Sequence, residues 1–195
     1  MDTGVESLRE IPIKEITTKT DTRDILAHCK FQGEQNKFDE IVIVDTDAHH
    51  MEIESWAAIC EYIEDEVQRT MALDHLRDRT GSPPYGINGD LALRYQDIGG
   101  RVPHQAKLGE VVEDTSVHRD VTLIRRAIDS FHLDYMVVFP TPMLNLGMHP
   151  QFDMEALLGR AYDHWFCENI LPMEPKMKTM LFVPFNDPHA ALKTV

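Results

Sequence analysis

The stretch IVIVDTDAHHMEIESW, residues 41–56, places two aspartates, two histidines and two glutamates directly after four β-branched apolar residues. A continuous apolar run of this length predicts a strand that is buried on both faces, as in parallel sheets. Alternate side chains of an extended segment share a face, so we expect Asp45, Asp47 and His49 to project to the same side. They follow the carboxyl end of the strand, where ligands and catalytic groups gather in parallel α/β folds. A carboxylate and an imidazole placed in this way suit a divalent metal ion such as Zn, Mn or Fe.

The next two charged residues, His50 and Glu52, fall on the opposite alternation unless the backbone turns there. The helix expected close behind them favours such a turn. Any one of these residues alone is better explained as a helix cap or a loop residue. A cluster of paired histidines beside carboxylates favours a metal site with Asp47 and His49 as ligands. Four roles stay open for Glu52: a further ligand of that metal, a ligand of a second metal together with His50, a group that orients His49, and a glutamate at a helix start.

The rest of the chain alternates helices with strands, which indicates an α/β architecture with a parallel sheet. Residues 79–118 are rich in proline and glycine, and we expect a long irregular insertion there, after the first strand. The other predicted elements are a helix with its apolar stripe at Trp56, Cys60, Ile63, Val67 and Met71, a helix with its stripe at Val121, Ile124, Ile128 and Phe131, a strand at 135–140, a helix at 153–169 with Asp153 as its N-cap, a strand at 179–185, and a helix opened by Asp187 and Pro188.

Three strands are too few for a closed (β/α)8 barrel, which needs eight strands and about 250 residues. If the fold is a barrel, residues 41–195 are its N-terminal part, and the alternative is a small open sheet. Residues 1–40 are polar, and we expect them to form an N-terminal extension that packs on the surface or embraces a partner subunit.

Composition narrows the function classes. The net charge of −14 opposes binding to nucleic acid and to anionic membrane surfaces. The N-terminus lacks a basic segment followed by an apolar one, so we expect no signal peptide, and no apolar run has the length of a membrane span. The three cysteines are far apart and odd in number, which favours reduced thiols in a cytoplasmic protein.

Two families place aspartates after a first strand. The segment VDTD resembles the Asp-x-Asp motif of haloacid-dehalogenase-like phosphatases, but His49 stands where that motif has Thr or Val. The segment DTDAHHMEIESW is more similar to the first motif of the amidohydrolase superfamily, in the branch of aminocarboxymuconate-semialdehyde decarboxylase. Asp47, His49 and Glu52 match that motif, and Ile53 replaces its proline. The segments at 116–141, 153–170 and 178–192 resemble the family's following helices and strands.

The resemblance implies a barrel with a metal ion, most often Zn or Mn, in which the first strand supplies two ligands. A histidine and an aspartate from later strands would complete the site, so the C-terminal half of a barrel or a second chain is an expected partner, in an oligomer. The implied function is that of a metal-dependent hydrolase or non-oxidative decarboxylase of a small carboxylated or amide-type substrate. Two alternatives stay open: a di-metal oxidative enzyme that uses His50 and Glu52, and a non-catalytic subunit of a heteromeric barrel. The catalytic and substrate-binding residues are not assigned.

Overall fold

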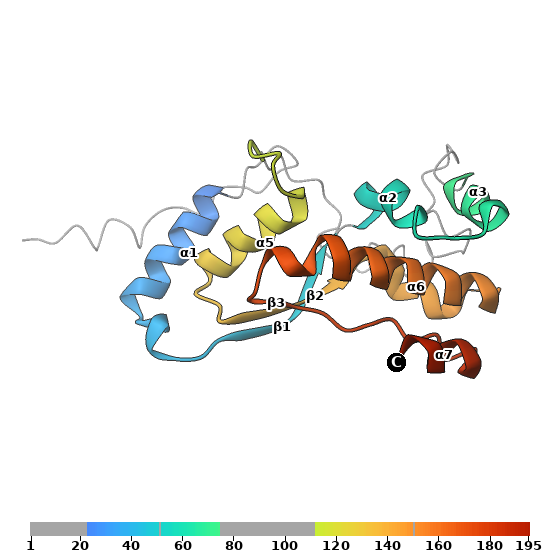
Figure 1. Ribbon diagram of the computed structural model, residues 1–195. Helices are drawn as coiled ribbons and strands as arrows, with labels where there is room; N and C mark the ends of the chain where they lie inside the picture. Colours follow the sequence, from blue (N-terminus) through green and yellow to red (C-terminus); the bar gives the residue numbers. More distant parts are fainter. Residues whose placement is uncertain (1–22, 51, 75–111, 150) are drawn as a thin grey trace, which may run out of the picture.

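The computed structural model describes residues 23–50, 52–74, 112–149 and 151–195 (Figure 1). Helices and strands both contribute, so the α/β class expected from the sequence is confirmed. No helix of these ranges is long and apolar enough to cross a membrane. The elements are α1 Arg23–Gln35, η1 Phe38–Glu40, β1 Val44–His50, η2 Glu52–Ser55, α2 Trp56–Cys60, α3 Glu66–Asp74, α5 Arg119–Ser130, β2 Tyr135–Pro140, η4 Pro142–Met148, α6 Phe152–Asn169, η5 Leu171–Met173, β3 Met177–Lys178 and α7 Pro188–Thr194.

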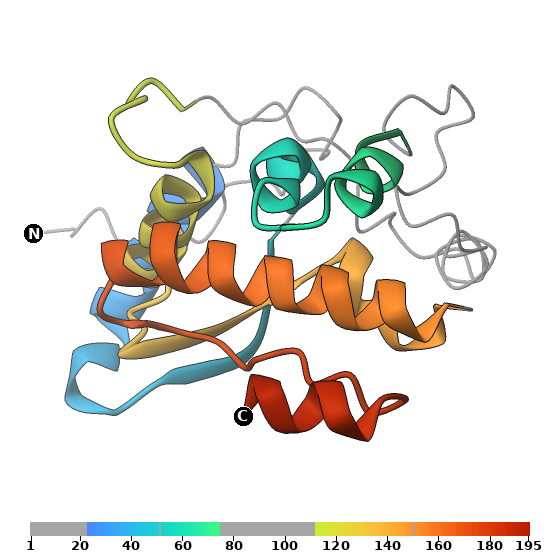
Figure 2. The same ribbon diagram turned by 45° about the vertical axis from the view of Figure 1, so that its right-hand side comes forward.

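The strands form a parallel three-stranded sheet in the order β1-β2-β3. Helices α5 and α6 lie over one face of the sheet, and Figure 2 shows α6 crossing above the strands. On that face Met136 and Val138 of β2 are buried. On the opposite face Val44 and Tyr135, which are partners in the β1–β2 register, are exposed. Among the described residues, helices therefore cover one side of the sheet, and the expectation of strands buried on both faces is wrong.

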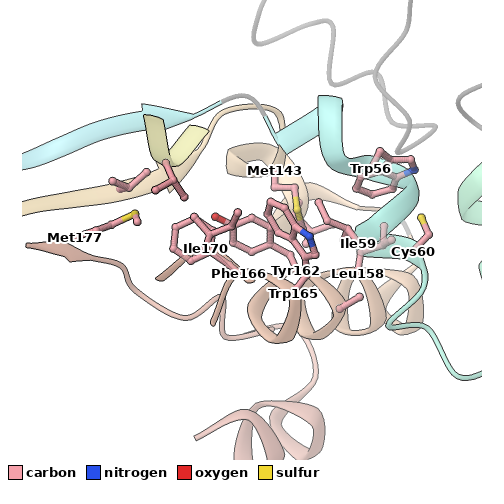
Figure 3. Close-up of a cluster of buried hydrophobic side chains, with 14 of the residues drawn as sticks. Trp56, Ile59, Cys60, Met143, Leu158, Tyr162, Trp165, Phe166, Ile170 and Met177 are labelled. Atoms are coloured by element: carbon pink, nitrogen blue, oxygen red, sulfur yellow. The ribbon is translucent and has the colours of Figure 1, made fainter. Parts of the chain in front are cut away.

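The apolar core lies between the sheet and the helices. Helix α6 contributes the aromatic side chains Tyr162, Trp165 and Phe166, each of which is almost fully buried. Figure 3 shows them gathered with Met143 of η4 and Ile59 of α2. Burial of a side chain of this size stabilises the folded state by about 1.5–3 kcal/mol, so this cluster holds α2, η4 and α6 together.

The first strand begins later and ends later than the apolar run suggests. It starts at Val44 and continues through His50, so Asp45, Asp47 and both histidines lie within the strand. Asp45 pairs with Met136 and Ala48 with Val138, which leaves one extra residue in β1 between these positions. Such a bulge interrupts the alternation of side chains. Asp45 consequently shares the register of buried Met136, and the prediction that it projects with Asp47 and His49 is wrong.

The single helix expected from Trp56 to Met71 is divided into α2 and α3. The Oδ1 atom of Asp65 accepts a hydrogen bond from the backbone N–H of Gln68 at 2.8 Å, so Asp65 begins a new helix. In α3, Val67 is 69% exposed and Met71 is also exposed. The apolar stripe predicted for this region therefore holds only as far as Ile63.

The third strand is much shorter than predicted. Only Met177 and Lys178 pair with β2, and residues 179–185 form no regular element. The backbone N–H of Phe182 donates to Oδ1 of Asp163 in α6 at 2.9 Å. A Cβ atom at Gly159 would lie 2.3 Å from the ring of Phe182, so glycine permits this close approach. The segment is held by α6 instead of extending the sheet.

Three other boundaries can be compared with the sequence. Strand β2 and helix α7 lie where they were predicted, and Asp187 caps α7 through the backbone N–H groups of His189 and Ala190. Helix α5 buries the stripe predicted for it except Phe131, which follows the last turn and is exposed. Helix α6 begins at Phe152, so Asp153 lies in its first turn and is not its N-cap.

Part of the predicted N-terminal extension is a helix that packs on the domain. Lys30 of α1 forms an ion pair with Asp129 of α5 at 2.8 Å. A Cβ atom at Gly33 would lie 2.2 Å from the ring of His132, so glycine again permits close packing. Residues 1–22 of the extension and 79–111 of the predicted insertion lie outside the described residues.

Candidate functional site

Asp47 and His49 lie together near the carboxyl end of β1. Nε2 of His49 is 3.2 Å from Oδ1 of Asp47. The side chain of Asp47 is 86% exposed and that of His49 is 34% exposed. The backbone N–H of Asp47 donates to Oδ1 of Asp45 at 3.0 Å, which holds the bulge in a local turn. The ring of His49 lies beside Phe139, its register partner on β2, with 6.0 Å between the ring centroids.

This pair has the chemistry of a partial metal site. An imidazole nitrogen and a carboxylate oxygen are ligands that Zn, Mn and Fe accept. Two donors are fewer than the three or four protein ligands that such an ion takes. Within the described ranges no group of three or more His, Cys, Asp or Glu side chains is arranged to hold a metal ion. The donor set therefore fits the expected metal in kind, and further ligands are needed to complete it.

Glu52, predicted as the third ligand, is placed elsewhere. Its carboxylate accepts hydrogen bonds from the backbone N–H of Thr141 at 2.9 Å and of Met143 at 2.6 Å. The side chain is fully buried, and burial raises its pKa to about 7 although His50 and the two N–H donors oppose the rise. Glu52 thus ties the ends of β1 and β2 together at the start of η4. The structure does not bring it to Asp47 and His49.

His50, predicted as a ligand of a second metal, points into the core. Its Nδ1 lies 2.9 Å from Oδ2 of Asp120 in α5, and its Nε2 lies 2.8 Å from the hydroxyl of Tyr162 in α6. Its side chain is only 3% exposed. Because both ring nitrogens already have partners, the structure does not form the His50–Glu52 site that a second metal would need. The strand alternation places His50 opposite His49, since no turn intervenes.

A second polar cluster, not anticipated from the sequence, joins Ser55 to His118. The Oγ atom of Ser55 lies 2.7 Å from Nε2 of His118, and Nδ1 of His118 lies 4.0 Å from Oδ2 of Asp120. The order of groups resembles a Ser-His-Asp triad. However, Nδ1 of His118 accepts a hydrogen bond from the backbone N–H of Asp120, so the ring proton is on Nε2. In that tautomer His118 cannot take the hydroxyl proton of Ser55, and its observed role is the N-cap of α5.

Two buried carboxyl groups of α6 were also missed. Glu155 and Asp163 flank Gly159 at steps of four residues and thus share one helix face. Glu155 accepts from the side chain of Asn186 at 2.8 Å, and burial raises the pKa of Asp163 to about 7. One oxygen of each carboxyl group has no hydrogen-bond partner. The spacing of Glu155, Gly159 and Asp163 is the one local signal that could have identified this face.

A cavity of about 620 Å³ lies apart from the predicted ligands. It is formed by α6, α7 and the link between α2 and α3, and Arg160 and Lys193 are among its lining residues. Neither Asp47 nor His49 borders it. The cavity therefore adds no ligand or substrate group to the pair.

Comparison with known proteins assigns no family: no family model matches the chain, and no curated protein matches it. The fold defines the class, which is an α/β protein with a parallel sheet covered by helices on one face.

Proposed function

We propose that the chain carries the first βα units of a metal-dependent (β/α)8 barrel of the amidohydrolase type, in which Asp47 and His49 are the metal ligands of the first strand. The enzyme would be a hydrolase or non-oxidative decarboxylase of a small carboxylated or amide-type substrate. The observation that carries the proposal is the exposed Asp47–His49 pair near the carboxyl end of β1, where His49 lies on the face that no described helix covers.

The order of the strands fits a barrel, although the first half of a doubly wound sheet also adds its strands at one edge. Each new strand is added at the same edge, and α5 and α6, which flank β2 in the sequence, cover the same face. A doubly wound sheet has helices on both faces, whereas a barrel turns one face inward. The uncovered face, with exposed Val44 and Tyr135, corresponds to that interior.

The pair would supply part of the catalytic centre. A bound metal ion polarises a carbonyl or carboxylate oxygen, or lowers the pKa of a bound water molecule. Asp47 and His49 would hold the ion where β1 ends, and the exposed face would admit the substrate. The other ligands and the general acid or base would come from later barrel strands, in the same polypeptide or in a partner subunit. Those strands would also cover the exposed apolar residues of the sheet.

The di-metal oxidative alternative has less support, because His50 and Glu52 already have protein partners. The non-catalytic subunit remains the second candidate, since the described part of the chain supplies two donors and no group of three or more. Metal content separates it from the enzyme.

Elemental analysis of the complete assembly tests the proposal. We expect a bound transition metal in the wild type and its loss in both Asp47→Ala and His49→Ala. His164→Ala removes another exposed histidine, on α6, and should retain the metal. Full metal occupancy in Asp47→Ala and His49→Ala would contradict the proposal, and a metal-free wild type would favour the non-catalytic subunit.

A further inference from the structure

Strand β1 contains two adjacent histidines, of which one is exposed and the other is buried. His49 is on the uncovered face beside Asp47, whereas His50 is in the core between the sheet and α6. The bulge between Asp45 and Ala48 lies directly before them. A shift of one residue in a strand moves each side chain to the opposite face. A slip at this bulge would therefore exchange the two histidines between the core and the uncovered face.

The ring of His50 has a polar partner on each of two helices. Nδ1 of the His50 ring lies 2.9 Å from Oδ2 of Asp120, within hydrogen-bond distance. Nε2 of the ring lies 2.8 Å from the hydroxyl of Tyr162, and burial raises the pKa of Tyr162 well above its ordinary value, so this hydroxyl keeps its proton. The two contacts come from different helices, α5 and α6, and together they use both ring nitrogens.

Aromatic packing restricts the same ring further. The centroid of the His50 ring lies 5.9 Å from that of Tyr162, 6.3 Å from that of Trp165 and 5.2 Å from that of Phe166. The backbone carbonyl of His50 accepts from the N–H of Thr141 at 3.0 Å, which joins the ends of β1 and β2. His50 is thus held by its ring and by its main chain.

We infer that His50, held by Asp120 and Tyr162, is a positioning residue that directs His49 to the metal side of the strand. This inference rests on the proposed function of Asp47 and His49 as metal ligands. The removal of a group that orients a metal-binding histidine typically lowers the metal affinity by about 10 to 100-fold. His50 would act in the same way through the backbone that it shares with His49.

The test is a titration of the complete metal-free protein with Co²⁺, followed by visible absorption of the bound ion. Tyr162→Phe keeps the buried ring and removes only the hydroxyl that contacts His50. Tyr62→Phe is the matched control, because it removes a hydroxyl that contacts Glu168 and Asn169, away from β1. We expect Tyr162→Phe to weaken Co²⁺ binding by about 10-fold or more and to change the absorption spectrum, and Tyr62→Phe to change neither.

A merely structural role for Tyr162 predicts a lower unfolding temperature with unchanged Co²⁺ affinity and spectrum in the folded protein, and that result would overturn the inference. Asp120→Asn provides a second variant, which weakens the other ring contact and should have the same effect on Co²⁺. Equal losses in Tyr162→Phe and Tyr62→Phe would also overturn it. A wild-type protein that binds no Co²⁺ would instead contradict the proposed metal site, and the inference with it.

Discussion

The carboxylate of Glu52 and the backbone N–H of Met143 form a hydrogen bond of 2.6 Å between residues 91 positions apart in the sequence. The other carboxylate oxygen accepts from the N–H of Thr141. The fully buried carboxylate thus accepts from two backbone donors at the start of η4, and it shares the N–H of Thr141 with the backbone carbonyl of His50. The charged residue that the sequence offers as a metal ligand is therefore part of the connection between β1 and β2.

Glu52→Gln should lower the free energy of unfolding by about 1–3 kcal/mol, because the amide places an N–H group against one of the two backbone donors. Urea denaturation at pH 8 measures this, since the pKa of Glu52 is about 7 and the wild-type carboxyl group is then mostly ionised. Glu64→Gln, at an exposed position, is the control. Metal binding at saturation should not fall in either variant. Equal stability of both variants would contradict this structural role of Glu52. A loss of metal in Glu52→Gln alone would favour its role as a metal ligand.

Gly159→Ala should destabilise the protein by about 1–3 kcal/mol, because its Cβ would lie 2.3 Å from the Phe182 ring. Without that contact the same change should stabilise α6 by up to about 1 kcal/mol, since alanine favours helix over glycine. We therefore expect Gly159→Ala to lower the free energy of unfolding of the wild type and to raise that of Phe182→Ala. Urea denaturation of the four proteins of this double-mutant cycle measures both changes. Stabilisation by Gly159→Ala in both backgrounds would show that Phe182 does not pack on this helix face.

Asp163 should make stability depend on pH. Burial raises its pKa from the ordinary value of 3.8 to about 7, so between these values the folded state holds a proton that the unfolded chain has released. The free energy of unfolding should then fall as the pH rises from about 4 to 7, and level off above. Asp163→Asn should reduce this slope by about 1.4 kcal/mol per pH unit, while the similar contribution of Glu52 remains. Identical slopes for wild type and variant, measured by urea denaturation across this range, would rule out a buried neutral Asp163.

The sequence correctly predicted the helices and strands that depend on residues close to one another in the chain. The apolar run at 135–140 is β2, and Asp187 before Pro188 caps α7 with its own side chain. The apolar run at 179–185 was predicted as a strand but forms no regular element, because the backbone of Phe182 is bound to Asp163 of α6. An alternation pattern contains no information about such a distant partner, nor about the bulge that moves Asp45 out of register.

In the candidate site too, the local contact was predictable from the sequence and the contacts with distant elements were not. Asp47 and His49 are two residues apart, and the strand alone brings them together. The partners of His50 are 70 and 112 residues away, in α5 and α6. No pattern around residue 50 distinguishes a histidine that binds metal from one that bonds to Asp120 and Tyr162. Only the structure therefore shows that His49 lies beside Asp47 and that His50 lies in the core.

The most direct test of the central claim is a crystal structure of the complete assembly with Zn²⁺ or Mn²⁺, with anomalous difference maps collected at the absorption edge of the metal. The account predicts a peak at the carboxyl end of β1, about 2.0–2.2 Å from Nε2 of His49 and from a carboxylate oxygen of Asp47. His50 should keep its contacts with Asp120 and Tyr162 in that structure. A bound metal whose ligands exclude Asp47 and His49, or one held between His50 and Glu52, would contradict the account.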